Sequence, residues 1–292
     1  MDITPEQFGT IDYPLRASAL PALLRCAGAL VLEYGISSEG GPAAHTGTAV
    51  GRAIELWHRG EGDPIPQVKE ESTSARHPFH LANWSEVEQM LSFYVADPRN
   101  DRRGVLTTSL EERVEYSIDP HDTDPTREQI WIRGHLDQVR VRQDGTREIW
   151  DLKSGQAQGH EMVNSHLMQQ VAYTYGYARA HPEHPVMWGG IIRLRGYMTR
   201  QRTENPDYDA AKGKKNNPKT KLVARDPGTE PVFFNAGLRW ADVEHAVEIV
   251  RLCVARVRSR SIVLRPGSHC DWCPGERFTM CRRTLKSRGF DV

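Results

Sequence analysis

Three charged residues have the types and the spacing that chemistry on phosphate esters requires. Asp137 ends the segment GHLD, and Asp151 and Lys153 lie in the following segment DLKSG. Carboxylate oxygens are preferred ligands of Mg²⁺ and Mn²⁺, and the backbone carbonyl of Leu152 could supply one more. A cation bound there would neutralise charge on a phosphodiester, while Lys153 would orient the attacking water or stabilise developing charge. The alternative is an ion pair on an edge strand, which contributes little to stability.

Whether the two acids meet depends on the turn between their strands. Alternating apolar and polar residues predict strands on both sides of the sequence QDGT at 143–146, which is a hairpin signal. A two-residue loop would set Asp137 opposite Leu152 and turn Asp151 to the other face. A three-residue loop, with its glycine in a left-handed bulge, sets Asp137 opposite Asp151, and Lys153 then shares their face. We predict the three-residue loop.

The remaining elements follow from hydrophobic periodicity and from turn residues. Helices are predicted at 15–34, 47–58, 85–95, 165–180 and 241–258, and strands at 105–118, 130–142, 148–153, 186–195 and 231–235. Proline-bearing connections are expected at 61–80 and 200–227. This order of elements, without an internal repeat or a clear linker, predicts one α/β domain over residues 1–292, with a mixed central sheet flanked by helices.

Composition limits the class of protein. Of the 292 residues, 38% are hydrophobic and 26% are charged, which suits a soluble globular chain with a real core. The formal net charge is zero, so any surface that attracts nucleic acid must be local. The first residues lack the apolar core of a signal peptide, and no apolar run reaches the length of about 18 residues that a membrane helix needs. We therefore expect a cytoplasmic protein.

A helix after the two acids adds a third motif. Gln169 and Tyr173 are four residues apart and therefore share a helix face, which would also suit an ordinary amphipathic helix. Together, Gly-x-x-Asp, Asp-x-Lys and Gln-x-x-x-Tyr resemble the PD-(D/E)XK nuclease superfamily in its RecB-like branch. The resemblance implies that Asp137 and Asp151 bind Mg²⁺ or Mn²⁺, that Lys153 assists catalysis, and that Gln169 and Tyr173 contact DNA or order the site. It also implies a restriction-endonuclease-like core at about 45–195.

An upstream helix carries a modified form of a further family motif. The usual form is Gly-x-x-x-His, but the residue four positions after Gly47 is Gly51. The segment from Gly51 to Glu55 instead fits the Gly-x-x-x-Glu form of phage-type relatives, which implies that Glu55 is a third carboxylate ligand of the metal. His45 and His58 flank this segment and could join the site, although single histidines are more often surface or capping residues.

Five cysteines suggest a second inorganic site. In a reducing compartment, three thiols clustered near the C-terminus indicate a metal or a cluster rather than disulfides. Three thiolates suit zinc or an iron–sulfur cluster, and His269 or Cys26 could be the fourth ligand. Cys253 lies in a helical pattern, where we expect it to pack in the core.

The resemblance to RecB-like nucleases that contain a cluster, among them CRISPR-associated exonucleases and AddB-type nuclease domains, favours iron–sulfur over zinc. It implies one cysteine before the nuclease motifs and three after them. The expected ligands of a 4Fe–4S cluster, which would join the N- and C-terminal segments, are Cys26, Cys270, Cys273 and Cys281.

A basic segment could bind DNA phosphates, or it could be a solvated insertion. Its positive charges are Lys212, Lys214, Lys215, Lys219 and Lys221. The resemblance implies a DNA exonuclease or endonuclease, acting on single-stranded DNA or on frayed ends in recombination, repair, phage replication or CRISPR adaptation. A helicase, a recombinase or a CRISPR integration protein would be its partner. The alternatives are a catalytically inactive DNA-binding scaffold of the same fold and a zinc-stabilised interaction module.

Overall fold

The computed structural model describes fifteen segments of the chain: residues 4–21, 26–28, 31, 41–60, 62–72, 80–100, 106–118, 129–155, 159–197, 200–209, 220–224, 233–234, 239–262, 278–287 and 289–291. Its helices are α3 (Pro42–Arg59), α4 (Pro64–Glu71), α5 (Trp84–Ala96), α6 (Gly159–Ala180), α7 (Trp240–Arg258) and α8 (Phe278–Ser287). Its strands are β1 (Leu15–Arg16), β2 (Leu106–Ser117), β3 (Trp131–Val141), β4 (Arg147–Lys153), β5 (Val186–Arg193), β6 (Arg200–Glu204), β7 (Thr220–Ala224) and β8 (Phe233–Phe234). Short 3-10 helices are η1 (Pro5–Gln7), η2 (Ala17–Ala19), η3 (Pro98–Asn100) and η4 (Leu194–Tyr197).

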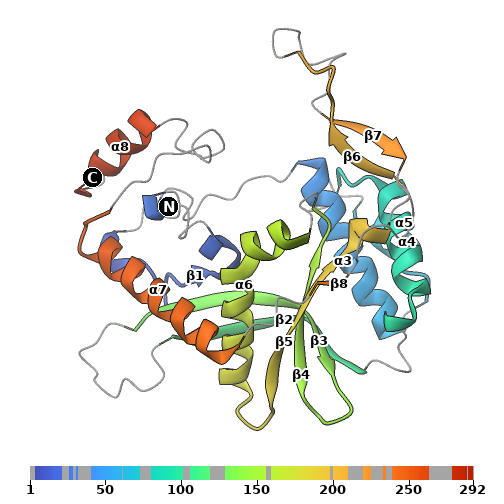
Figure 1. The fold of residues 1–292 in the computed structure, drawn as a ribbon, viewed down its shortest axis with the longest axis horizontal. Coiled ribbons are helices and arrows are strands. Elements are labelled where there is room, and N and C mark those ends of the chain that lie inside the picture. Colours follow the sequence, from blue (N-terminus) through green and yellow to red (C-terminus); the bar gives the residue numbers. More distant parts are fainter. Residues whose placement is uncertain are drawn as a thin grey trace.

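A six-stranded mixed sheet forms the centre of the molecule (Figure 1). Its order is β1-β3-β4-β5-β8, and β2 pairs with β3. The β2–β3, β3–β4 and β5–β8 pairs are antiparallel, whereas β1–β3 and β4–β5 are parallel. The predicted α/β class with a mixed sheet is therefore confirmed. The parallel β4–β5 pair needs a crossover connection, and α6 is that crossover.

Two hydrophobic cores lie on opposite faces of this sheet. On one face, α6 and α7 cover β2, β3 and β4 (Figure 1). The helix α6 comes very close to β2, because a Cβ atom at Gly176 would overlap the ring of Tyr116. The Tyr116 hydroxyl donates a hydrogen bond to the carbonyl of Ala172 at 2.5 Å. The second core packs α3, α4 and α5 against the end of β5, where Ile192 and Leu194 are buried.

The N-terminal part of the predicted helix at 15–34 is wrong. Leu15 and Arg16 form a strand parallel to β3, and Leu15 is fully buried there, opposite Ile132. Pro21 lies inside the predicted span and disfavours a continuous helix, because proline removes one backbone donor and clashes with the preceding turn. The first residues of this segment thus belong to the sheet and to a short 3-10 turn. Leu20, Pro21, Ala27, Gly28 and Val31 are helical, and the rest of the predicted span lies outside the described residues.

Four further helices and strands were not predicted. The connection expected at 61–80 contains α4, which begins with Pro64 at its first position and with an Asp63 side chain that accepts a hydrogen bond from the Ile65 amide. The ends of the segment expected to be a loop at 200–227 pair as the antiparallel strands β6 and β7. Near the C-terminus, α8 is an additional helix.

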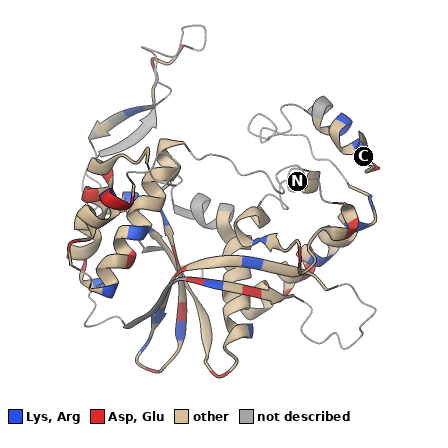
Figure 2. Ribbon diagram, turned by 180° about the vertical axis from the view of Figure 1, so that it is seen from behind, with Lys and Arg blue, Asp and Glu red and all other residues tan. Residues whose placement is uncertain are grey.

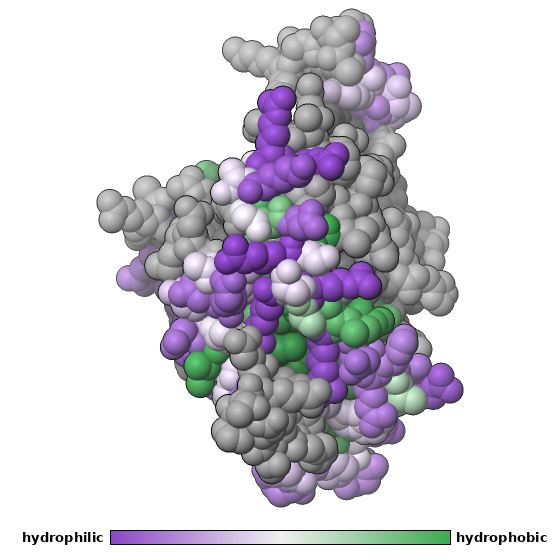
Figure 3. Space-filling model, turned by 90° about the vertical axis from the view of Figure 1, so that its left-hand side faces the viewer, coloured by the Kyte–Doolittle hydropathy of each residue, from purple (hydrophilic) through white to green (hydrophobic). Residues whose placement is uncertain are grey.

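Charged groups of both signs are mixed over the described surface. Figure 2 shows basic and acidic residues interspersed along the strands and helices, in agreement with the zero formal net charge. The side of the molecule that carries α7 and α8 is mainly hydrophilic, with small apolar patches (Figure 3). Among the described residues, no helix is long and apolar enough to cross a membrane.

Candidate active site

The hairpin that joins β3 to β4 has the predicted three-residue loop. The Arg142 amide donates to the Thr146 carbonyl at 2.9 Å, and the Gly145 amide donates to the Arg142 carbonyl at 3.0 Å. Gly145 has a φ of 83°, the left-handed conformation expected of the bulge. In the resulting register, Gln138 pairs with Trp150. The pairing ends there, and the next residues on the two strands are Asp137 and Asp151.

Asp137, Asp151 and Lys153 meet where the hairpin pairing ends. Lys153 Nζ donates to Asp151 Oδ1 at 2.9 Å and lies 2.7 Å from Oδ2. Asp137 Oδ2 accepts a hydrogen bond from the Leu152 amide at 2.7 Å, which ties the first carboxylate to the backbone of the second strand. The Asp151 side chain is fully buried, so this ion pair differs from the exposed edge-strand pair that the sequence left open.

Two opposing effects set the charge of Lys153. Burial lowers the pKa of its ammonium group, but the negative charges of Asp151 and Asp137 and the hydrogen bond to Asp151 outweigh burial. The net result is a pKa above the usual value of 10.5. Lys153 therefore carries a proton at neutral pH and acts as a fixed positive charge between two carboxylates.

The donor set at this site fits a hard divalent cation. Asp151 Oδ2 is buried and faces the Lys153 ammonium group at 2.7 Å, although this contact lacks hydrogen-bond geometry. Asp151, Asp137 and the Leu152 carbonyl are oxygen donors of the kind that Mg²⁺ and Mn²⁺ bind. Within the described ranges, no group of three or more His, Cys, Asp or Glu residues is placed to hold a metal.

The helix α6 brings its motif against β3. Gln169 Nε2 donates to the Tyr173 hydroxyl at 2.9 Å, and both residues are buried. The Tyr173 ring lies on Gly134, where a Cβ atom would come within 2.6 Å of Tyr173 Cε1 and 3.0 Å of Ala17 Cβ. The glycine at the start of GHLD is thus required by contact with the tyrosine of the third motif. The geometry supports an ordering role for this pair, and its contact with DNA stays a prediction.

The three motifs therefore lie on β3, β4 and α6, in the order and on the kinds of element that the sequence indicated. A family model of the PD-(D/E)XK nuclease superfamily matches residues 14–278, which is most of the chain. The chain belongs to the PD-(D/E)XK nuclease superfamily. Nuclease activity is the general activity of this superfamily, and its members usually use divalent metals such as Mg²⁺. A search of curated proteins finds no match.

In this PD-(D/E)XK chain, Glu55 is buried but is paired with arginines of its own helix. Arg52 Nη1 donates to Glu55 Oε2 at 2.7 Å, and Arg59 contacts the other oxygen. Arg52 also binds Glu71 of α4, and these two carboxylates raise its pKa. Metal binding by Glu55 stays a prediction, and it would require the carboxylate to leave these arginines.

The two histidines near this helix have partners in the protein. His58 Nε2 lies 2.9 Å from the Tyr94 hydroxyl and 3.3 Å from Gln138 Nε2. His45 Nδ1 accepts a hydrogen bond from the Leu81 amide at 3.2 Å. Both histidines are thus engaged in holding α3 to its neighbours.

A buried arginine that the sequence did not single out supports the end of β4. Arg195 in η4 donates to the Ser154 carbonyl at 2.5 Å and to Glu86 Oε2 of α5 at 2.9 Å. On the other side, α3 comes so close that a Cβ atom at Gly47 would overlap the Ser154 hydroxyl. Ser154 follows Lys153 directly, so these contacts fix the position of the catalytic strand. In the sequence, only Gly47 hinted at this contact, because a glycine inside a helix can mark a close approach to a neighbouring element.

Only part of each remaining predicted site is described. Cys26 and Cys281 are both buried, whereas Cys270 and Cys273 lie outside the described residues. Cys253 packs against the larger core, as predicted. Of the basic segment, Lys221 belongs to β7, where its Nζ is 3.9 Å from Asp207 Oδ2. The other members lie outside the described residues: Lys212, Lys214, Lys215 and Lys219.

Proposed function

We propose that this protein is a metal-dependent DNA exonuclease of the RecB-like branch, which acts on single-stranded DNA or on frayed ends. The observation that carries the proposal is the hairpin register. Its last pair is Gln138 with Trp150, so Asp137 and Asp151 are the next residues on the two strands, and Lys153 is ion-paired to Asp151. The superfamily membership supports phosphodiester hydrolysis, and the carboxylate oxygens of Asp137 and Asp151 support a divalent cation at this position.

Each residue of the site has a distinct task in this proposal. A divalent cation held by Asp137, Asp151 and the Leu152 carbonyl supplies charge neutralisation at the scissile phosphate. The Lys153 ammonium group orients the attacking water and stabilises the negative charge that develops on the phosphate oxygens. Gln169 and Tyr173 hold α6 against Gly134 and so keep the floor of the site in place.

The nuclease proposal is tested with labelled DNA substrates whose 5′ or 3′ ends are blocked. We expect degradation that requires Mg²⁺ or Mn²⁺, needs one free end, and is faster on single strands than on closed duplex. Loss of degradation with one blocked end would also give the strand polarity. Cleavage of circular single strands would instead establish an endonuclease.

Three variants separate catalysis from folding. Asp151→Asn and Lys153→Met should each reduce the rate by about a thousandfold or more, because they remove a metal ligand and a charge at the reacting phosphate. Asp144→Asn is the matched control, since this exposed acid lies in the same hairpin and an asparagine can still accept the Thr146 amide. Full activity in Asp151→Asn would refute the catalytic assignment. DNA binding without cleavage in the unmodified protein would favour the inactive scaffold.

We also propose that a 4Fe–4S cluster joins the two ends of the chain. Support comes from the burial of Cys26 and Cys281, and from the position of both chain ends on the same side of the molecule (Figure 1). Protein purified without oxygen should contain iron and sulfide, and Cys281→Ala should lose both, while Cys253→Ala keeps them. Stoichiometric zinc in a colourless protein would contradict the cluster and support the zinc-stabilised module.

The cellular role follows from the reaction class. A nuclease that consumes frayed or single-stranded ends fits recombination, repair, phage replication or CRISPR adaptation. A helicase, a recombinase or a CRISPR integration protein would supply those ends. Co-purification of such a partner with the Asp151→Asn variant, which should retain bound DNA, is the direct measurement.

A further inference from the structure

One part of the central sheet has a face that none of the described helices covers. Along β2 and β3, the buried residues Val114, Tyr116 and Ile132 belong to the larger hydrophobic core, and the residues between them are exposed or partly exposed. Because successive side chains of a strand point to opposite sides, those residues lie on the side away from α6. Figure 2 shows β2 and β3 in front of α6 in this region. We call this surface the open face, and its residues are Arg16, Arg113, Glu115, Trp131, Arg133 and His135.

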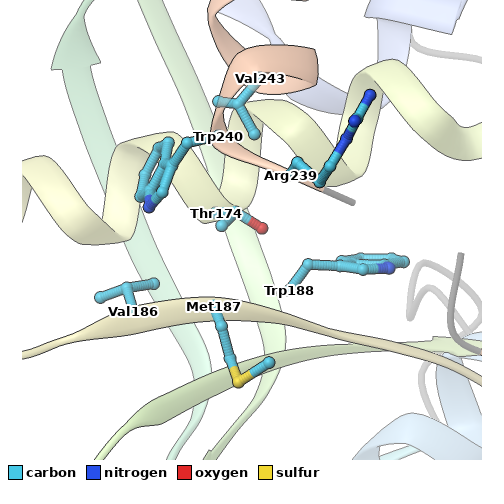
Figure 4. A pocket seen from close by; sticks show the side chains of 7 residues that line it. All are labelled: Thr174, Val186, Met187, Trp188, Arg239, Trp240 and Val243. Carbon is cyan, nitrogen blue, oxygen red and sulfur yellow. The ribbon is translucent and has the colours of Figure 1, made fainter. Parts of the chain in front are cut away.

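Helices cover other parts of the sheet. On the side of the open face, α3, α4 and α5 pack near β4 and β5. On the opposite side, Figure 4 shows Thr174 of α6 and Val243 of α7 above Val186 and Trp188 of β5. The cavity between them is about 60 Å³, which holds a few water molecules but is too small for a nucleobase. An extended ligand therefore has room against the sheet on the open face.

The open face carries an excess of positive charge. In one row across three strands, Glu115 of β2 pairs with Arg133 of β3, and Arg133 pairs with Arg16 of β1. Glu115 accepts hydrogen bonds from Arg133 Nε at 2.9 Å and from Arg113 Nη2 at 2.5 Å, so two guanidinium groups share one carboxylate. Arg16 is exposed and has no ion pair with any residue that the structure describes. Three arginines and one glutamate give this face a net charge of +2, on a chain whose formal net charge is zero.

The contact row of Arg133 and Arg16 is not explained by folding alone. Like charges directly opposite each other on neighbouring strands destabilise a sheet. An anion bound over this row would remove the repulsion, and a guanidinium group can bind phosphate through two parallel hydrogen bonds. The side chains of Arg113 and Arg133 are 57% and 40% exposed, so both have donors that reach solvent beside Glu115. The open face therefore fits a ligand with repeated phosphates.

Aromatic rings alternate with the basic groups on β3. Trp131, Arg133 and His135 are each two residues apart, so their side chains follow one another along one side of the strand. His135 is exposed, and Trp131 is partly exposed. Surfaces that bind single-stranded nucleic acid combine rings, on which bases stack, with positive charges that hold the backbone. Paired bases in a duplex cannot present their faces to such rings, so the pattern favours a single strand.

The open face adjoins the catalytic acids. Asp137 follows His135 by two residues on β3, which is about 7 Å along the strand. We propose that the open face binds a single strand of DNA on its way to the site at Asp137 and Asp151. The proposal rests on the proposed nuclease function, and it names the surface that holds the substrate beyond the reacting phosphate.

Binding of a short fluorescein-labelled single strand tests the proposal. All measurements use the full chain with Asp151→Asn, so that the DNA stays intact. Arg16→Gln should raise the dissociation constant about fivefold, and it should reduce the slope of log affinity against log salt by about 0.7, as expected for one lost phosphate contact. Arg256→Gln is the matched control, because it makes the same charge change at an exposed position of α7, on the opposite side of the sheet.

A change of opposite sign separates DNA binding from folding. Glu115→Gln removes the carboxylate that Arg113 and Arg133 share, so this variant should bind the single strand about threefold more tightly although the folded protein loses two ion pairs. A purely structural role of Glu115 would give weaker binding. Weaker binding by Glu115→Gln, equal effects of Arg16→Gln and Arg256→Gln, or tighter binding of a closed duplex than of the single strand would each overturn the assignment.

The two proposals fail in different ways. Normal cleavage by the unmodified protein, together with open-face variants that bind single strands like the parent, would overturn only the open face. Binding of single strands that depends on Arg16 and Glu115, in a protein that cleaves no DNA with any divalent metal, would overturn only the nuclease.

Discussion

At the scale of single residues, the main feature of the site is the ion pair between the buried Asp151 and Lys153. Asp151 is fully buried, and the Lys153 ammonium group lies 2.7 Å from its Oδ2. Breaking a buried ion pair by removing one partner is costly because the other charge remains without compensation, whereas removing both charges costs far less. The stability of the metal-free protein should therefore depend on the pair rather than on either residue alone.

This coupling is measurable as a double-mutant cycle. Lys153→Met should lower the free energy of unfolding by about 2 kcal/mol in the presence of a chelator, less than for a fully buried pair because 18% of the lysine side chain is exposed. Lys153→Met combined with Asp151→Asn should cost clearly less than the sum of the two single changes. Urea denaturation of the four proteins gives the coupling, and strict additivity would show that the two residues do not interact.

A second prediction concerns Glu115, which lies between two arginines. Hydrogen bonds from Arg133 and then Arg113 hold the pKa of the Glu115 carboxyl below 4.5. A lowered pKa in the folded state means that the stabilisation is present above the unfolded value of about 4.3 and is lost as pH falls through the folded value. Glu115→Gln should thus be less stable than the parent by about 0.5 kcal/mol at pH 7. The difference should shrink in urea titrations as the pH falls below the unfolded value, and a difference that grows in acid would contradict this sign.

At the scale of elements, glycines decide how closely helices approach the sheet. A Cβ atom at Gly176 of α6 would overlap the buried ring of Tyr116 on β2, which has no room to move aside. At Gly51 of α3, by contrast, a Cβ atom would meet nothing within 4 Å. The same substitution therefore has opposite consequences on two helices.

Replacement of these two glycines by alanine tests this difference. Gly176→Ala should destabilise the protein by about 2 kcal/mol or more, because α6 must shift away from β2. Gly51→Ala should stabilise it by about 0.5–1 kcal/mol, because alanine is the better helix former and has space. Thermal unfolding of both variants provides the measurement, and a destabilised Gly51→Ala would mean that this glycine is needed for another reason.

The end of β4 depends on contacts from two other elements. Arg195 ties the Ser154 carbonyl to Glu86 of α5, and both charged groups are buried. Arg195→Met should lower kcat for DNA cleavage about tenfold or more, because a catalytic group displaced by about 1 Å loses much of its rate. Arg195→Lys should recover part of that loss, since it keeps the charge opposite Glu86. A change in KM alone would point to substrate binding rather than to positioning of Lys153.

At the scale of the whole molecule, distant parts of the chain are joined around α7. Arg258 at the end of α7 donates to the carbonyls of Phe8 and Gln129, each at 3.0 Å. The residue Ile262, which follows α7, also contacts the C-terminal segment: its amide donates to the Asp291 carbonyl at 3.2 Å. These hydrogen bonds thus connect the N-terminal segment, the residues before β3 and the C-terminus.

Loss of the Arg258 contacts should loosen the N-terminal segment. Arg258→Met should make the chain near Phe8 more sensitive to limited proteolysis, while the rate of DNA cleavage stays close to that of the parent, because the site is on other elements. The exposed Arg256, two residues earlier on α7, is the control when changed to methionine. Equal proteolysis of both variants would show that these hydrogen bonds do not hold the segment.

The amino-acid sequence alone determined the catalytic hairpin and the choice of motifs. The segment from Asp137 to Lys153 is local, and the left-handed glycine of its turn fits the register of the two strands without residues from elsewhere in the chain. Hydrophobic periodicity also located α5, α6 and α7, with boundaries shifted by a few residues. The periodicity wrongly predicted a helix at Leu15, which lies in a strand, because over two or three residues a strand and a helix can have the same apolar pattern.

Only the tertiary structure decided which remote residues meet. Tyr173 against Gly134, Arg195 on Ser154, and Thr174 beside Trp188 join residues that no spacing rule connects. The physical reason is that close packing and burial depend on the shape of both partners, whereas periodicity reports only that a residue faces some core. The sequence therefore specified the chemistry at Asp151, and the fold decided what holds it in place.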